Sequence, residues 1–195
     1  MNFLAHFHLA WPDDGLIAGG LEGDYFKGLL KGELEPGIER GVKLHRSIDA
    51  HTDNHPVIVQ LREGFPKSLR RYAGILIDIS FDHYLTQHWA NYSSLPLEEF
   101  THQVYRALRV QEQHLSEGSR AMLSRMLEYD ILNCYHDWGA VTATATRVGM
   151  RFSRGNPLLE VERDLEPIRT DLERAFLEFY PQLLSFSQNQ QTQLN

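Results

Sequence analysis

The segment Lys67–Trp89 reads KSLRRYAGILIDISFDHYLTQHW and follows Pro66, a residue type that favours the first turn of a helix. Its apolar residues cover most of the circumference of a helix, so we predict a long helix near the centre of the fold. Asp78 interrupts the apolar run GILIDISF within this helix. An ionised carboxylate in such surroundings is unfavourable unless it is paired or bound to a cation. The segment therefore predicts both the core and a charged site within it.

Apolar residues elsewhere recur at spacings of three and four, the period of amphipathic helices, and no stretch alternates as a strand does. We predict an all-α, single-domain helical bundle at residues 1–186, long enough for a substantial core. A polar tail, expected to be disordered, follows at 187–195. The other predicted helices are one capped by Asp13 and Asp14 that carries Leu16, Ile17, Leu21, Tyr25 and Leu29, one from Pro36 to about Asn54, and further ones at Val57–Glu63, Leu97–Leu115, Ser119–Cys134, Trp138–Phe152 and Leu158–Phe186.

Charge and cysteine content limit the partners and the compartment. The formal net charge of −7 disfavours nonspecific binding to nucleic acid or to an anionic membrane. The single cysteine, Cys134, cannot form an internal disulfide, and its apolar neighbours in YDILNCY predict a small buried side chain. No apolar stretch reaches the roughly 20 residues of a transmembrane helix, and the N-terminus lacks the basic region of a signal peptide. We expect a cytoplasmic protein that binds neither nucleic acid nor membranes.

A second segment, GVKLHRSIDAHTDNHP at Gly41–Pro56, places imidazoles and carboxylates within a few helical turns. His45 and Asp49 are four residues apart and share a helix face, as do Asp78 and Asp82. Two carboxylates on one face repel each other unless a proton, a cationic side chain or a metal lies between them. Together the two helices offer a pocket of imidazoles and carboxylates, a ligand set that suits manganese, magnesium, iron or zinc.

Simpler interpretations stay open for each residue taken alone. His45 can be a hydrogen-bonded core histidine, and Asp24 in GDYFKG can face solvent. His6 and His8 in MNFLAHFHLA would share a side of an extended segment but not of a helix. They can be ligands, outer hydrogen-bond donors to the ligands, or part of a cap over the core. Residues of the same segments whose roles also stay open are His51 and Asp53.

Five separate segments together resemble the acyl carrier protein phosphodiesterase family: MNFLAHFHLA, GDYFKG, GVKLHRSIDAHTDNHP, DHYLTQHW and, late in the chain, FLEFYP. The similarity runs in order over most of the chain and is densest at residues 1–89. It implies a helical, HD-domain-like hydrolase. It also implies that the substrate is holo acyl carrier protein, that the products are apo carrier and free 4′-phosphopantetheine, and that the activating ion is manganese.

The resemblance assigns roles to individual residues. It implies that metal is bound or oriented by His45, Asp49, Asp78 and Asp82. It implies ligand or acid–base roles for Asp24 and His83, and we expect Arg46 to steady the phosphate. A standard HD doublet is His followed by Asp, whereas Asp82-His83 has the reverse order.

Acyl carrier proteins are acidic, so an acidic enzyme needs a positive surface to bind one. The segment REGFPKSLRRY supplies one candidate surface, made of Arg62, Lys67, Arg70 and Arg71. A second candidate consists of Arg147, Arg151 and Arg154. The default interpretation of any such run of charges is a solvated helix face.

Two other functions are compatible with these patterns. An HD-type nucleotide phosphohydrolase would use the same metal chemistry but would need contacts for a base. A non-catalytic helical adaptor would use the polar cluster only to fix the geometry of its core.

Overall fold

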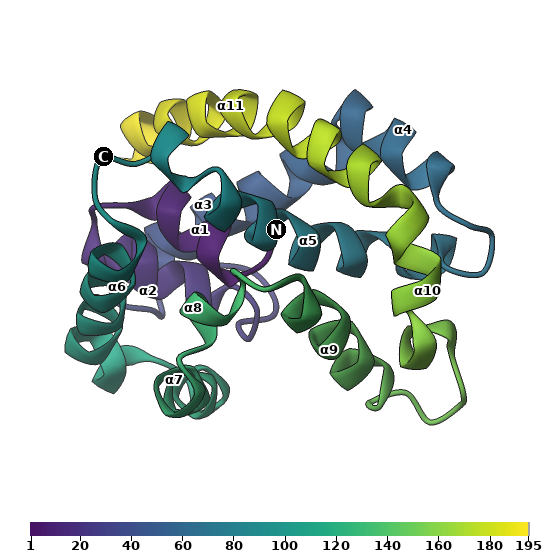
Figure 1. Ribbon diagram of the computed structural model, residues 1–195. Coiled ribbons are helices and arrows are strands. Elements are labelled where there is room, and N and C mark those ends of the chain that lie inside the picture. Colours follow the sequence, from purple (N-terminus) through teal and green to yellow (C-terminus); the bar gives the residue numbers. More distant parts are fainter. Residues whose placement is uncertain (195) are drawn as a thin grey trace.

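The computed structural model describes residues 1–194, and within this range it contains helices and no strand (Figure 1). The predicted all-α class is therefore confirmed. The α-helices are α1 (Phe3–Ala10), α2 (Asp14–Glu22), α3 (Pro36–Asn54), α4 (Pro56–Gly64), α5 (Ala73–Gln87), α6 (Leu97–Gln111), α7 (Glu117–Tyr129), α8 (Ile131–Cys134), α9 (Trp138–Gly149), α10 (Glu162–Leu165) and α11 (Arg169–Leu194). Short 3₁₀ helices are η1 (Arg70–Tyr72), η2 (Trp89–Asn91), η3 (Glu112–His114), η4 (Pro157–Glu160) and η5 (Glu166–Ile168).

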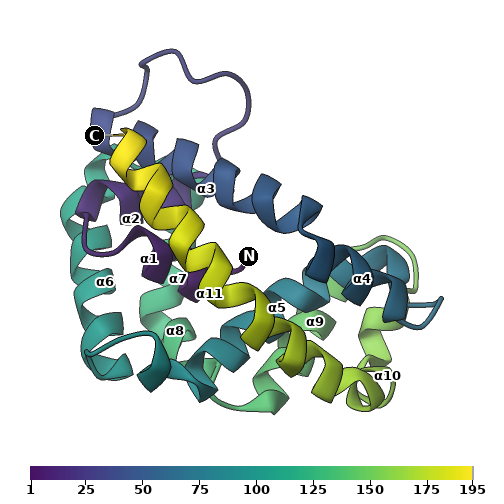
Figure 2. The ribbon, with the colours of Figure 1, turned by 90° about the horizontal axis from the view of Figure 1, so that it is seen from above.

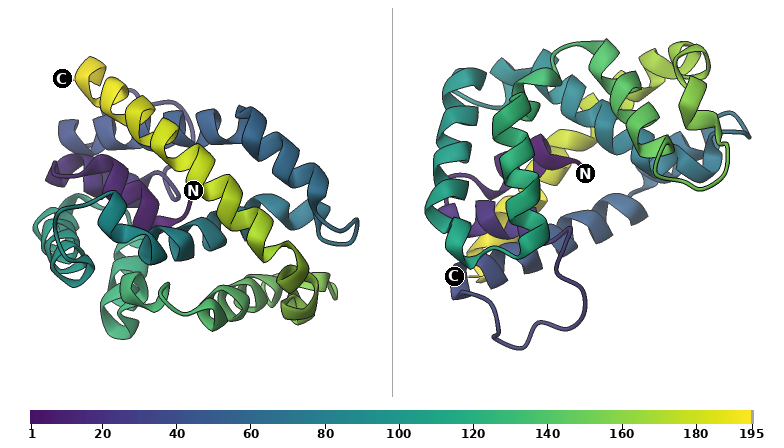
Figure 3. Two further views of the ribbon diagram at one scale, coloured as in Figure 1. Left: turned by 45° about the horizontal axis from the view of Figure 1, so that its top comes forward. Right: turned by 90° about the horizontal axis from the view of Figure 1, so that it is seen from below.

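The short helix α1 lies at the centre of this arrangement. Every residue from Leu4 to Ala10 is buried, and α2, α3, α5 and α11 pack around the helix. Seen from above, α11 runs diagonally across α1 and α5 (Figure 2). The N-terminus consequently lies near the middle of the molecule, where the views from the front and from below both show it (Figure 3).

Helices α2 and α3 cross at unusually short range because glycines face each other. A Cβ atom added to Gly19 would lie 2.4 Å from the Cα atom of Gly41 and 2.4 Å from the carbonyl oxygen of Ile38. Gly15 and Gly37 meet in the same way one turn away. Because no side chain separates the two backbones, α2 fixes the position of α3, the helix that carries His45 and Asp49.

The predicted first helix is shorter than expected. Helix α2 ends at Glu22, so Tyr25 and Leu29 lie in the following coil, and the Leu29 side chain is 77% exposed. Gly28 and Gly32 in this coil have φ angles of +101° and +77°, which only glycine adopts without strain.

Several later helices are also shorter than predicted. The central helix α5 begins at Ala73, after the single 3₁₀ turn η1. The predicted helix Ser119–Cys134 is divided into α7 and α8 at Asp130, whose φ angle is +46°. The predicted helix Leu158–Phe186 is divided into η4, α10, η5 and α11, since Pro167 lies at the start of η5 and lacks an N–H donor.

Two expectations about polar and buried residues are wrong. The segment 187–194 is not disordered but continues α11, and residue 195 lies outside the described residues. The Ser187 hydroxyl and the Gln191 side-chain amide both donate hydrogen bonds to the carbonyl oxygen of Leu9, each at 2.7 Å. Cys134 is exposed rather than buried, because α8 is a single short turn and Leu132 is its buried residue.

Among the described residues, no helix combines the length and the apolar character that a membrane crossing requires. The cytoplasmic location stays a prediction.

The substitution Gly19→Ala should force α2 and α3 apart, because its Cβ would overlap backbone atoms that have no room to move. We expect a loss of about 2–3 kcal/mol in the free energy of unfolding, measured by urea denaturation. Gly64→Ala is the matched control, since no atom lies within 4 Å of its added Cβ and its stability should be unchanged. Equal stability of the two variants would contradict the close crossing.

Candidate metal and active site

A cluster of two imidazoles and one carboxylate forms where α1 meets α3. Nε2 of His6 lies 3.1 Å from Oδ1 of Asp49, and Nε2 of His45 lies 3.1 Å from Oδ2 of the same carboxylate. The two imidazole rings are stacked with their centroids 4.0 Å apart. His45 and Asp49 therefore share a face of α3 as predicted, and α1 adds His6 to them.

The spacing of this cluster fits a single divalent ion. All three donor atoms lie within 4.8 Å of one another. Ligand atoms that surround an ion at about 2.1 Å lie roughly 3 Å apart in octahedral geometry, which agrees with the two measured distances of 3.1 Å. Two imidazoles and a carboxylate are also a common ligand set for transition metals.

The protonation states suit metal binding as well. Burial and the neighbouring His45 lower the pKa of His6 to about 3, so its imidazole is neutral near pH 7. Burial would raise the pKa of Asp49, but hydrogen bonds from His45 and His6 outweigh burial and hold the pKa well below its usual range. Neutral imidazoles and an ionised carboxylate are the forms that coordinate metal ions.

A positive charge already lies between two carboxylates at this place. The α-amino group of Met1 is 3.1 Å from Oδ1 of Asp49 on α3 and 3.1 Å from Oδ1 of Asp78 on α5. Burial lowers the pKa of this amino group, but the two carboxylates raise it to a net value of about 10. The charge of Asp78 is thus tolerated in an apolar segment because a cation, the ammonium group of Met1, lies beside it.

The cluster opens to solvent through a pocket of about 350 Å³. Asp24 lies at its mouth, with Oδ1 3.9 Å from Nε2 of His45 and a side chain that is 47% exposed. The other lining residues are Gly23, Phe26, Lys27, Gly28, His45, Arg46 and Asp49. The pocket therefore combines the Asp49 carboxylate at its base with the Asp24 carboxylate and the exposed amine of Lys27 at its rim.

Arg46 shapes one wall of this pocket. Its two terminal nitrogens donate hydrogen bonds of 2.9 Å to the carbonyl oxygens of Gly28 and Phe26. The guanidinium group also lies 5.9 Å from the centre of the Phe26 ring. Arg46 thus lines the pocket, and its side chain holds the coil that follows α2. Its expected role toward a phosphate stays a prediction.

Asp82 lies outside the cluster, in contrast to the prediction. Its side chain is fully buried, and its two oxygens accept hydrogen bonds of 2.9 and 3.0 Å from the backbone N–H groups of Leu4 and Ala5. Burial raises its pKa to about 7, although these two hydrogen bonds oppose the shift. Asp78 and Asp82 do share one face of α5, but that face meets the first turn of α1. Asp82 anchors this first turn through its two hydrogen bonds.

His83 also points away from the cluster. Adjacent residues on a helix lie about 100° apart, so His83 cannot face the same neighbours as Asp82. Its Nδ1 atom lies 2.9 Å from the carbonyl oxygen of Tyr135, and its ring contacts Trp138 edge-on with centroids 5.2 Å apart. His83 therefore packs against the chain between α8 and α9.

The sequence left open the roles of His6, His8, His51 and Asp53. Of these residues, His6 belongs to the cluster and the other three lie outside it. His8 lies 2.8 Å from the Tyr180 hydroxyl, on another side of α1 from His6, because this segment is helical. The His51 ring stacks on Phe186 with centroids 4.0 Å apart. The Asp53 carboxylate forms an ion pair with Arg62. His6 was the functional residue hardest to place from sequence, and the only signal for it was an imidazole within an apolar run.

The predicted docking residues at the start of α5 are partly engaged within the protein. Arg62 is paired with Asp53, and Arg70 donates a 2.9 Å hydrogen bond to the carbonyl oxygen of Glu63. Lys67 and Arg71 are exposed. The second candidate set, at the end of α9 and beyond, is exposed throughout: Arg147, Arg151 and Arg154.

Comparisons with known proteins agree with one another. A family profile described as acyl carrier protein phosphodiesterase matches residues 1–183. An acyl carrier protein phosphodiesterase from Klebsiella pneumoniae (strain 342) is 34% identical over 199 residues, which cover 98% of this chain and 100% of that protein. A relative of the same name from Escherichia coli O6:H1 is 32% identical, over 94% of this chain and 96% of that protein. One from Photorhabdus laumondii is 29% identical, over 97% and 96% respectively.

No solved structure matches the chain significantly. The HD-domain-like topology therefore stays a prediction, beyond the all-α class that the structure confirms.

The substitution Gly23→Ala tests the position of the His45 ring within the cluster. A Cβ on Gly23 would lie 2.5 Å from Cγ and Cδ2 of His45, so the imidazole must move away from Asp49. We expect Mn²⁺ affinity, measured by isothermal titration calorimetry, to fall by roughly 10–100-fold. Gly64→Ala should leave the affinity unchanged, and an unchanged affinity of Gly23→Ala would refute the assigned position of His45.

Proposed function

The chain belongs to the acyl carrier protein phosphodiesterase family, and from that premise we propose that it hydrolyses the phosphodiester linking 4′-phosphopantetheine to holo acyl carrier protein. The products are apo carrier protein and free 4′-phosphopantetheine. The observation that carries the proposal is the cluster of His6, His45 and Asp49, of which His45 and Asp49 line a solvent-open pocket.

His6, His45 and Asp49 are the residues that would hold a divalent ion, with Asp24 and Asp78 as nearby carboxylates. Manganese is our first choice, and magnesium, iron and zinc suit the same donors. When bound, such an ion polarises a phosphoryl oxygen and makes water more acidic. This set keeps two of the four residues that the resemblance implied as ligands, His45 and Asp49, and adds His6.

The side chains around the pocket supply the remaining chemistry. Asp24, at the mouth, is placed to take a proton from the attacking water. As the water oxygen forms its bond to phosphorus, the bond from phosphorus to the serine oxygen of the carrier breaks. Asp24 then returns the proton to that serine oxygen, so one water is consumed and the protons balance. Lys27 at the rim neutralises charge on the phosphate, and Arg46 keeps the wall in place.

Incubating the protein with holo carrier protein and Mn²⁺ should remove the mass of phosphopantetheine from the carrier, as read by mass spectrometry. Asp49→Asn and His45→Gln should each lower the rate by at least about 10²-fold, because each removes a donor at the base of the pocket. Asp171→Asn and His102→Gln are matched controls on exposed positions and should retain the wild-type rate. Release of product from a nucleotide panel, with the carrier untouched, would instead identify a nucleotide phosphohydrolase.

Thermal melting provides a test of metal binding that needs no activity. Mn²⁺ at about 100 times its dissociation constant should stabilise the wild type by about 2.7 kcal/mol, since the ion binds only the folded state. His6→Gln should lose most of this stabilisation, whereas His102→Gln should keep it. A wild-type protein that gains no stability from Mn²⁺ and releases no product would be a non-catalytic adaptor.

A further inference from the structure

A positively charged surface with exposed apolar groups lies at the end of α9. We call it the α9-end surface, and it consists of Arg147, Met150, Arg151, Phe152 and Arg154. All five residues are exposed, with Met150 70% and Phe152 44% accessible. Methionine, aromatic residues and arginine are the residue types enriched where one protein binds another.

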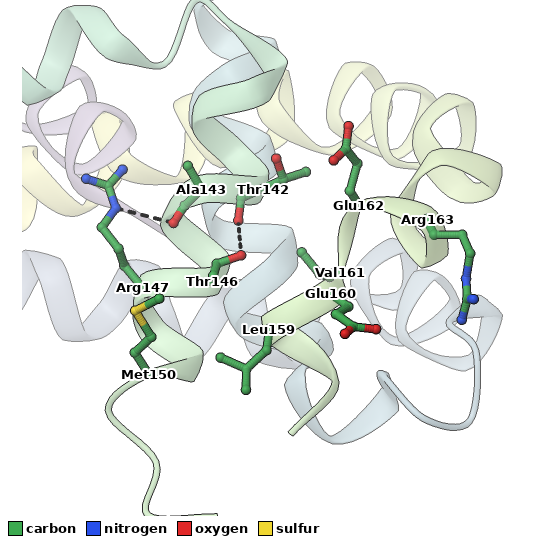
Figure 4. Close-up of a pocket in the computed structure, with 10 residues that line it drawn as sticks. All are labelled: Thr142, Ala143, Thr146, Arg147, Met150, Leu159, Glu160, Val161, Glu162 and Arg163. Carbon is green, nitrogen blue, oxygen red and sulfur yellow. Dashed lines mark hydrogen bonds between the residues drawn. The ribbon is translucent and has the colours of Figure 1, made fainter. Parts of the chain in front are cut away.

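The charges of this surface are free to act on a partner. Within residues 1–194, the side chains of Arg151 and Arg154 make no hydrogen bond or ion pair. The Arg147 guanidinium bonds only within α9, to the Ala143 carbonyl oxygen and the Thr144 hydroxyl (Figure 4 shows the first of these). In the competing set near α5, two arginines are already engaged by protein groups.

The α9-end surface lies beside the helix that carries Asp78. Helix α9 packs against α5. The positive charge of Arg151 also acts on Tyr25, the residue after Asp24, because it opposes the rise in the Tyr25 pKa that burial and Asp24 cause. The Phe152 ring packs edge-on against Tyr72, immediately before α5, with centroids 5.7 Å apart.

The chemistry of the proposed reaction places the carrier close to the pocket. The bond that breaks joins phosphorus to a serine on the carrier surface, at the root of the prosthetic arm and not at its far end. The carrier cannot reach the pocket with an extended arm alone, so its own surface must contact the pocket mouth. A docking surface for this reaction must therefore adjoin the mouth.

We propose that the α9-end surface is the recognition surface for the acidic acyl carrier protein, an inference that rests on the proposed function. Its arginines contact carboxylates of the carrier, and Met150 and Phe152 cover apolar groups beside the modified serine. Opposite charges accelerate association and fix orientation, which delivers the serine to the pocket.

The neighbouring groove limits how far the carrier extends. A groove of about 760 Å³ separates α9 from η4 and α10, with Arg147 and Met150 on the α9 side (Figure 4). Glu160, Glu162 and Arg163 line its opposite side, where the two carboxylates outnumber the one cation. The α9 side of the groove is therefore the more positive side and the better match for an acidic carrier.

The double variant Arg151→Glu/Arg154→Glu tests the proposal in the full-length protein with Mn²⁺. We expect KM for holo carrier protein to rise by about tenfold or more and its dependence on salt to weaken. Mn²⁺-dependent melting and hydrolysis of bis(p-nitrophenyl) phosphate should stay at wild-type values, because the base of the pocket is untouched. Arg106→Glu/Arg109→Glu on α6 is the charge-matched control and should leave KM unchanged.

An unchanged KM in the Arg151/Arg154 variant, or an equal rise in the control, overturns the assignment. A rise only in Arg70→Glu/Arg71→Glu would transfer recognition to the start of α5 and also overturns it. If the glutamate variant does not fold, Arg151→Gln/Arg154→Gln removes the charges without reversing them and is expected to raise KM less. If the wild-type protein releases no phosphopantetheine, the proposed function itself is refuted. If the wild type releases it and the Arg151/Arg154 variant keeps the wild-type KM, only the assignment of the docking surface is refuted.

Discussion

The first turn of α1 is held by acidic groups of two other helices, and the site depends on this contact. Asp82 accepts hydrogen bonds from the backbone N–H groups of Leu4 and Ala5, which have no partner within the helix. The ammonium group of Met1 lies between Asp49 and Asp78. The positive end of α1 thus meets carboxylates from α3 and α5. Asp82 and the Met1 amino group are buried and would be unfavourable without their partners, whereas Asp49 and Asp78 are partly exposed. The contact fixes α1 in position and direction.

This contact also determines which imidazoles meet. With α1 anchored, His6 is stacked on His45 and both reach Asp49, while His8 points to Tyr180 on α11. The glycine crossing of α2 and α3 sets the other side of the site, since it fixes the helix that carries His45 and Asp49. A neutral His6 imidazole beside the ionised Asp49 carboxylate results from burial and from mutual hydrogen bonds. The fold therefore assembles donors compatible with a divalent cation through contacts that are also needed for stability.

Spacing within one helix was sufficient for part of the site. The four-residue separation correctly placed His45 beside Asp49 and put Asp78 and Asp82 on one face, and apolar periodicity gave the all-α class. Spacing could not show what that face of α5 would meet, because the partner is the backbone of a distant segment. It also could not show that α11 continues through a polar tail, since the hydrogen bonds to Leu9 that hold it come from the other end of the chain. Such contacts are tertiary, and no local pattern encodes them.

The distribution of charge links the site to its substrate. Two carboxylates line the pocket, Asp49 at its base and Asp24 at its mouth, and a phosphodiester is itself negative, so these side chains repel the group that the protein is proposed to cleave. Attraction must come from a bound cation and from positive groups at the rim. Because fields are screened beyond about 8–10 Å, the net charge of −7 does not decide the encounter. The exposed arginines at the end of α9 can attract an acidic carrier, while the donors at the base of the pocket are compatible with a cation.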